Sequence, residues 1–405
     1  MTRVHGVTTM PVEQLAPNFD LFDPQHSERL WEVLDFARTA CPVLKTDADD
    51  GYHIVTRYDD VRAVLTDAET FSSVEAGLRG VPVPMPPLTE DPPNHIEYRK
   101  ALNHYLTRSF LSRYEESIRR YARNLLDDLV PRGRFEFMTE FAVPFTSGNL
   151  AKVILADDNE TRLQSAIQLA ADISSYGRNE AFFELAELAE ELLNERMTFG
   201  GDRDDILSAI IRATVQGRPL TMQERVGATM ILFTGGLDTT KAALGSIVKH
   251  IADDPSLEAR VRDPEWVKRD LDEFLRLDSP IAFMARTVTK DTELNGCPLR
   301  PGDRVAVHYA SANRDASQFA HPAELDFERQ RNPHAAFGIG PHRCIGLHFA
   351  RLQIEIGFQE LFNRITNVRI PQGERVHTAT GVVQAHEYLP IEFDFASATQ
   401  GPSDN

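Results

Sequence analysis

The residues that are most clearly suited to carry out chemistry lie between Phe337 and Gly346, where a cysteine on a glycine-rich loop precedes an apolar helix pattern. The N-terminus of a helix presents unpaired N–H groups and a partial positive charge, and both stabilise a thiolate relative to a thiol. Gly338, Gly340 and Gly346 permit positive φ and close backbone approach, so a large flat group could lie against the loop. Cys344 is therefore a candidate thiolate ligand. The alternative is a small buried hydrophobe, the commoner fate of a single cysteine.

A second informative stretch is a long helix predicted between residues 221 and 254. Thr221 and Glu224 have the spacing of a capping box, and no proline occurs before Pro255. A helix of about 30 residues is roughly 45 Å long, which is enough to cross the molecule.

The middle of this helix contains Gly235 and Gly236, each of which costs a helix interior roughly 1 kcal/mol relative to alanine. They stand directly before Asp238 and Thr239, and the Thr239 hydroxyl can bond the Gly235 carbonyl four residues back. A carboxylate–hydroxyl pair at such a loosened stretch can relay protons. The alternative is a tolerated kink with a capped aspartate.

Two further pairs have helical spacing. His95 and Arg99 lie four residues apart on one face, and they form either a binding pair or a solvated basic face. Glu273 and Arg276 lie three apart, and such pairs are ordinarily surface bridges that contribute little stability.

The pattern Phe-Gly-x-Gly-x-His-x-Cys-x-Gly and the helix motif Gly-Gly-Leu-Asp-Thr together resemble the cytochrome P450 superfamily, over about residues 42–395. The helix motif is closest to the distal helix of bacterial camphor hydroxylases. The resemblance implies that Cys344 is the proximal thiolate ligand of heme b (iron protoporphyrin IX), a ligation that favours O–O cleavage. It implies Asp238 and Thr239 as the catalytic proton relay. It further implies cofactor contacts from His95, Arg99, Gly235, Gly236, Arg286, Phe337, Gly338, His342, Ile345 and Gly346.

The same resemblance gives Glu273, Arg276 and Arg329 a structural role in supporting the Cys344 loop. Matching to the family's contact regions gives six expected substrate contacts: Met85, Thr234, Ala282, Phe283, Val382 and Val383. Most are apolar, so we expect a small to medium lipophilic substrate, terpenoid or aromatic. The alternative is a carboxylate-bearing substrate that meets Arg79 or Arg178.

The expected fold is mainly α with small β-sheets, a single cytochrome P450 domain over residues 1–405. We expect an irregular segment at 1–30, a proline-rich substrate-covering loop at 72–93 and a tail at 396–405. The patterns predict a hairpin from 43–44 and 52–56 and strands at 305–308 and 382–384. Helices are predicted at 30–38, 58–65, 111–129, 145–156, 160–173 and 181–197.

The composition argues against several classes of protein. A net charge of −18 argues against nucleic acid and anionic membranes as partners, and no run of 18 apolar residues occurs. No signal peptide is recognisable, so we expect a cytoplasmic protein, and a monomer. Three cysteines (Cys41, Cys297, Cys344) are too few for a disulfide framework.

Three functions are compatible with the motifs: a haem-thiolate monooxygenase, a peroxide-using or NO-reducing relative, and a haem sensor without turnover. The intact Asp238–Thr239 pair favours the monooxygenase, by hydroxylation or O-demethylation, because only that reaction needs the relay. No flavin or Fe–S motif is present, so electrons are expected from a separate ferredoxin with an NAD(P)H-dependent reductase. A basic set around Cys344 would attract such an acidic partner: Arg329, Arg331, His334, His342, Arg343 and Arg351.

Overall fold

The computed structural model describes residues 10–81, 83–155, 161–162, 165–166, 168–169, 179–199 and 203–396. Most of the helix predicted at 160–173, Arg178 and nearly all of the predicted tail lie outside these residues.

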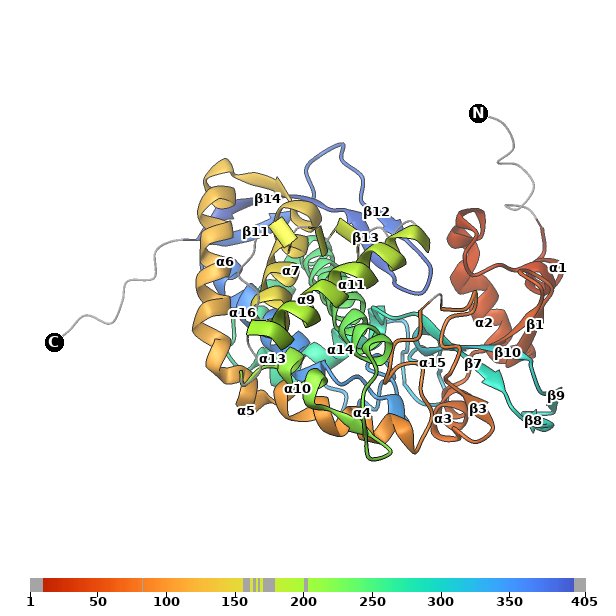
Figure 1. Ribbon diagram of the computed structural model, residues 1–405. Coiled ribbons are helices and arrows are strands. Elements are labelled where there is room, and N and C mark those ends of the chain that lie inside the picture. The colour runs from red at the N-terminus through yellow and green to blue at the C-terminus, as the bar shows by residue number, and fades with distance from the viewer. Residues whose placement is uncertain are drawn as a thin grey trace.

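The described chain is mainly helical with small sheets, which confirms the predicted fold class (Figure 1). Helices gather around the long α11, while the largest sheet lies with the N-terminal helices at the other side of the molecule. The α-helices are α1 Val12–Leu15, α2 Leu30–Ala40, α3 Tyr58–Thr66, α4 Asn94–Asn103, α5 Arg108–Leu111, α6 Glu115–Leu129, α7 Val143–Leu150, α9 Asn179–Phe199, α10 Ile206–Arg212, α11 Met222–Asp253, α12 Glu258–Val261, α13 Trp266–Arg269, α14 Leu271–Asp278, α15 Tyr309–Ala312 and α16 Leu347–Phe362.

Helix α11 begins at the predicted capping box. The Glu224 N–H donates to Thr221 Oγ1 at 3.3 Å, and the Thr221 N–H donates to the Glu224 carboxylate at 2.7 Å. A Cβ at Gly236 would lie 2.7 Å from the Leu150 side chain, so the missing side chain lets α7 pack close to the middle of α11. The helix therefore runs through the core at the level where its glycines occur.

The largest sheet has the strand order β1-β2-β10-β7-β3. The hairpin of β1 and β2 and the strand at 305–308 are confirmed. The strand predicted at 382–384 is wrong. Val383 forms only an isolated bridge with Ile281, because it lies in the connection that leads into β13. The five strands are β1 Val43–Thr46, β2 Tyr52–Val55, β3 Phe71–Ser72, β7 Phe283–Val288 and β10 Arg304–His308.

Smaller sheets lie at the edges of the molecule. One has the order β11-β14-β4, and three are two-stranded, pairing β12 with β13, β5 with β6, and β8 with β9. Their bounds are β4 Arg134–Glu136, β5 Thr214–Val215, β6 Arg218–Pro219, β8 Thr292–Leu294, β9 Cys297–Leu299, β11 Ile365–Arg369, β12 His377–Ala379, β13 Ala385–Tyr388 and β14 Pro390–Phe395.

Helical detail differs from the sequence prediction at three places. The N-terminal segment, expected to be irregular, contains α1 and 3-10 turns at Ala16–Asn18 and Pro24–Arg29, because Leu15 and Phe19 are buried against α2. The helix predicted at 111–129 is broken by a 3-10 turn at Ser112–Tyr114. Helix α7 continues as a π-helix over Ala151–Leu155. None of the described helices combines the length and apolar character needed to cross a bilayer.

Candidate active site

The Cys344 loop is held by its own backbone. The Cys344 N–H donates to the Phe337 carbonyl at 2.7 Å, which folds the chain back on itself directly before α16. Gly338 and Gly340 have φ of 70° and 74°, as the sequence predicts. Gly346 differs: its φ is −85°, and it serves as the N-cap of α16 instead. A Cβ at Gly346 would meet only Cys344 Sγ at 3.9 Å, so this glycine leaves open space beside the sulfur.

The Cys344 thiol lies in dense surroundings and yet keeps a partly accessible surface. Burial raises the pKa of this thiol, and the opposing effects of the Gly346 and Leu347 N–H groups and of Arg99 and Arg343 are smaller. The N–H groups at the start of α16 therefore act in the direction that the sequence predicts, but burial outweighs them. A directly bound metal cation would supply the missing positive charge.

Two imidazoles meet where α4 contacts the Cys344 loop, and among the described residues most of their ring nitrogens have no hydrogen-bond partner. The rings of His95 and His342 lie 4.1 Å apart, and within the described part of the chain His95 Nδ1, His95 Nε2 and His342 Nε2 are buried with no hydrogen-bond partner. Burial, helped by the charges of Arg99 and Arg286, lowers the pKa of His95 to about 4 and that of His342 to about 3. Two arginines and two unsatisfied imidazoles thus converge on one place, which suits an anionic ligand with several acceptor oxygens.

The middle of α11 presents an accessible strip in an otherwise buried helix. Thr234, Gly235 and Thr239 are each at least partly exposed, and a Cβ at Gly235 would have only one side-chain atom within 4 Å. The Thr239 hydroxyl donates to the Gly235 carbonyl at 3.1 Å, as predicted. Asp238 is buried and forms an ion pair with Lys241. Burial raises the pKa of Asp238, and Lys241 opposes that shift.

The structure brings Glu273, Arg276 and Arg329 together. Arg276 is fully buried and donates to both Glu273 oxygens, at 2.9 and 2.7 Å, and to three backbone carbonyls between residues 313 and 324. Arg329 Nε lies 3.2 Å from the same carboxylate. This is a buried network and not the weak surface bridge that an isolated pair would form.

Four of the predicted substrate contacts form two pairs of neighbours. Met85 is buried, with its sulfur 3.9 Å from Thr234 Oγ1 on α11. Val382 accepts a backbone bond from Ala282 at 2.8 Å, and Val383 follows it directly.

Two other predicted contacts have different surroundings. Phe283 is almost fully buried, and its ring packs against Phe22 and His308, both 5.7 Å away, so it belongs to the packing of the N-terminal region. Arg79 pairs with Asp49 at 2.8 Å on the surface and stacks over Phe22. The alternative of a carboxylate held by Arg178 concerns a residue outside the described chain.

Three site-forming residues were missed from sequence. A Cβ at Gly227 would lie 2.1 Å from the Pro84 carbonyl, so the proline-rich loop rests on α11 at this glycine. Tyr309 hydrogen-bonds Arg286. Lys241 pairs with Asp238, and its spacing of three residues was the available signal.

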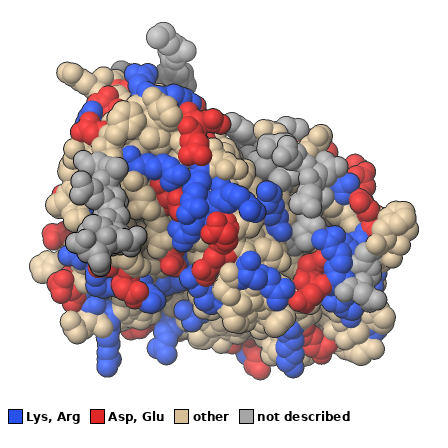
Figure 2. All heavy atoms as spheres, turned by 90° about the vertical axis from the view of Figure 1, so that its left-hand side faces the viewer, with Lys and Arg blue, Asp and Glu red and all other residues tan. Residues whose placement is uncertain are grey.

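Several members of the basic set around Cys344 are paired with acidic side chains or buried, which the sequence does not show. Asp272 on α14 pairs with both His334 and Arg351, and Arg329 is buried. Arg343 is exposed, and the structure shows no ion pair for it among the described residues. On the face that carries α6, basic and acidic side chains are interspersed (Figure 2), in keeping with pairs such as Arg119–Glu360.

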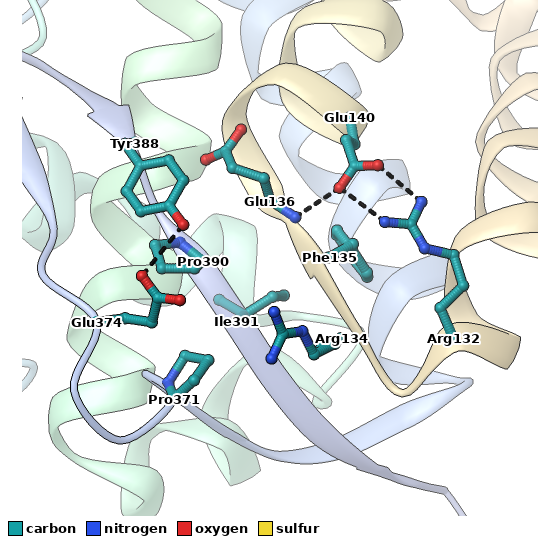
Figure 3. Close-up of a pocket in the computed structure, with 10 residues that line it drawn as sticks. All are labelled: Arg132, Arg134, Phe135, Glu136, Glu140, Pro371, Glu374, Tyr388, Pro390 and Ile391. Carbon is teal, nitrogen blue, oxygen red and sulfur yellow. Dashed lines mark hydrogen bonds and ion pairs between the residues drawn. The ribbon is translucent and has the colours of Figure 1, made fainter.

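A separate open pocket of about 450 Å³ lies at β4, β14 and the chain before β12, away from every predicted site residue (Figure 3). Its charges are largely engaged with one another: Arg132 pairs with Glu140, and the Tyr388 hydroxyl donates to Glu374. This pocket therefore does not mark the chemistry of the Cys344 loop.

Comparisons with known proteins agree with this geometry. The sequence profile described as Cytochrome P450 matches residues 266–384. A probable cytochrome P450 127A1 of Sinorhizobium fredii is 33% identical, covering 82% of this chain and 81% of its own. A steroid C26-monooxygenase of Mycolicibacterium smegmatis is 28% identical, covering 85% and 88%. The crystal structure of CYP108D1 from Novosphingobium aromaticivorans superimposes with a TM-score of 0.82 at 26% identity, covering 93% and 97%.

The chain belongs to the cytochrome P450 family. It is accordingly an oxidoreductase of the monooxygenase class.

The residues present fit the haem that this family implies. The accessible thiol, the unsatisfied imidazoles beside two arginines, and the open space at Gly235 and Gly346 match a flat, metal-bearing, dicarboxylate group.

Proposed function

We propose that this protein inserts one oxygen atom from O2 into a small to medium lipophilic substrate, by hydroxylation or O-demethylation, with electrons from a separate ferredoxin and its NAD(P)H-dependent reductase. The observation that carries the proposal is the accessible strip of α11, with Thr239 partly exposed and the buried Asp238 beside it. A haem protein that only binds ligands has no need of a proton-carrying pair at this position.

Each residue has a proposed role. Cys344 would ligate the haem iron, while His95, Arg99, Arg286 and His342 would hold the propionates. When bound, the haem supplies the activation of O2 and the transfer of its oxygen atom.

The protein's own contribution is to deliver protons and to exclude water. Asp238 would accept a proton from the interior side of α11, and Thr239 would donate one toward the hollow beside Gly235. The packing of the proline-rich loop on α11 would shield the substrate from bulk water, because Met85 lies buried against Thr234.

The proposed substrate class follows from the side chains of the predicted substrate contacts. Met85, Ala282, Val382 and Val383 offer apolar contact, and the Thr234 hydroxyl already donates to the Met230 carbonyl. Apolar walls with few polar groups favour lipophilic ligands. A steroid C26-monooxygenase among the relatives is compatible with this class. A ligand panel screened for a haem spin-state shift would identify the compounds that enter.

The first test is Cys344→Ser. We expect the reduced CO complex to lose the Soret position typical of thiolate ligation, while far-ultraviolet circular dichroism stays close to wild type. A variant spectrum identical to wild type would remove Cys344 from the iron.

A further inference from the structure

Asp238 has a buried countercharge on its own helix. Lys241 follows Asp238 by three residues, and its Nζ forms an ion pair with Asp238 Oδ1. The Asp238 side chain is 6% exposed and that of Lys241 is 14% exposed, so the pair is shielded from water. Pairs with this spacing usually lie on the surface of a helix. Shielding makes the charge of Lys241 count far more than it would on the surface.

The hydrogen bonds of the relay pair run in different directions. The Thr239 hydroxyl donates to the Gly235 carbonyl, while the Asp238 carboxylate is held by Lys241. We propose that Lys241 is a positioning residue for proton delivery, which keeps the Asp238 carboxylate ionised inside the protein and ready to accept a proton. This inference rests on the proposed function of Asp238 as a relay.

The physical reason is the energetic cost of a lone buried carboxylate. Burial raises the pKa of Asp238, whereas the charge and hydrogen bond of Lys241 lower it. Without Lys241, the burial that raises this pKa would act unopposed, so the carboxyl group would hold its proton up to a higher pH and would be less able to accept another. Lys241 would thus set the pH range in which the relay can work.

Other titratable groups near this face of α11 do not replace Lys241. Gly245 lies seven residues beyond Asp238 on the same face, and a Cβ there would lie 3.8 Å from His386 of β13. Burial lowers the pKa of His386, so its ring is neutral at neutral pH. Further along the helix, Lys249 forms its own ion pair with Asp253. Among the described residues, Lys241 is the charged group whose field acts on Asp238.

The test is an infrared titration of the haem-loaded protein. The carbonyl stretch of protonated Asp238 is assigned by its loss in Asp238→Asn and is followed against pH. In Lys241→Gln and Lys241→Met we expect the proton affinity of Asp238 to rise roughly tenfold or more. Lys241→Arg should restore a midpoint near wild type, because it keeps the positive charge.

Lys249→Gln is the matched control, since it removes a lysine from an exposed ion pair on the same helix. It should leave the Asp238 midpoint unchanged. Lys241→Met keeps the apolar stem and carries the test if the glutamine variant does not fold. Equal midpoints in wild type and in the folded neutral variants would overturn the inference.

The outcome is separable from that of the proposed relay. If Thr239→Ala couples electrons to product as wild type does and Asp238→Asn turns over at the wild-type rate, the relay is wrong, whatever the titration shows. If Thr239→Ala uncouples and Asp238→Asn slows turnover, but the titration midpoint of Asp238 does not change on removal of Lys241, the relay stands and the role of Lys241 is refuted.

Discussion

His95 and His342 lie with their ring centroids 4.1 Å apart and their ring planes tilted by 43°, although one lies on α4 and the other in the Cys344 loop. Three of their four ring nitrogens are buried and have no hydrogen-bond partner among the residues that the structure describes. Both rings are neutral, so each carries one N–H donor and one acceptor nitrogen, and buried polar atoms without partners are costly. A polar group bound beside the two rings would remove this cost. The two elements are therefore shaped for a ligand that both of them hold.

His95→Leu should weaken haem retention without changing the iron ligand. The loss of one charge-assisted hydrogen bond costs about 1.5–3 kcal/mol, which corresponds to roughly 10- to 150-fold in affinity. Haem transfer to apomyoglobin measures retention, and His95→Gln, which keeps a donor, is the control. Unchanged transfer rates in both variants would contradict a propionate contact.

Thr239→Ala should separate electron use from product formation. Without the hydroxyl, protons no longer reach the substrate-facing side of α11 in the right place, so NADH oxidation should continue while O2 leaves as hydrogen peroxide. Asp238→Asn should mainly slow turnover, about 10²- to 10⁴-fold at most. Product, peroxide and NADH are measured together. Wild-type coupling in Thr239→Ala would refute the relay.

Gly227→Ala should displace the proline-rich loop. The added Cβ would lie 2.1 Å from the Pro84 carbonyl and 2.9 Å from Pro86 Cδ, so backbone must shift, and overpacking costs about 1–3 kcal/mol. Because Met85 lies between these prolines, lipophilic ligands should bind more weakly. Spin-state titration and thermal melting report the two effects, with Ser246→Ala on the same helix as control. If ligand affinity and melting temperature both stay at their wild-type values, the position of the proline-rich loop does not depend on the missing side chain at Gly227.

Much of this site could be predicted from sequence, because its motifs are local. The Cys344 loop is read from its glycines, and α11 from its capping box and lack of proline. What failed depends on tertiary contact: Val383 has strand propensity but meets a partner at one residue only. The role of Phe283 as a substrate contact stays a prediction; the sequence could not show that its ring packs against Phe22, because that contact joins distant parts of the chain.

Charge pairing across the chain was equally hidden. Arg351 looked available for a partner, yet Asp272, from a helix far away in sequence, neutralises it. The sequence does not show which basic residues are paired, because neither the net charge nor the position of a residue says which acidic side chain lies beside it in the fold. The same limit applied to Lys241, although there the spacing was visible.

The His250–Asp278 pair predicts a pH-dependent stability. Burial alone would lower the pKa of His250, but the hydrogen bond and charge of Asp278, 2.9 Å away, outweigh it and raise the pKa above 6.5. Asp253 also raises this pKa, whereas Lys249 lowers it. A raised folded-state pKa gives stability that is fully present below pH 6.5 and lost as pH rises through the folded value.

Asp278→Asn removes this charge interaction. The variant should be less stable than wild type at pH 6, by up to about 1 kcal/mol, and the difference should shrink by pH 9. Urea denaturation midpoints across this range measure it. A difference that is constant with pH would show that His250 stays neutral throughout.

The last prediction concerns the electron donor and the exposed Arg343. The protein carries a net charge of −18, yet Arg343 stands next to Cys344, exposed and without an ion pair among the described residues. Exposed charges act mainly on association rate and are screened within about 8 Å at physiological ionic strength. Reduction by an acidic ferredoxin should therefore slow as salt rises, while substrate affinity changes little.

Arg343→Glu should slow this reduction further, by about tenfold at low salt, and flatten its salt dependence without moving the haem spectrum. Arg351→Glu should do less than its sequence position suggests, because Asp272 already neutralises Arg351. Arg375→Glu, the same charge change in an exposed loop before β12, is the matched control. Stopped-flow reduction against ionic strength decides the matter. A flat dependence in wild type, or an equal loss in Arg375→Glu, would mean that the donor docks away from the Cys344 loop.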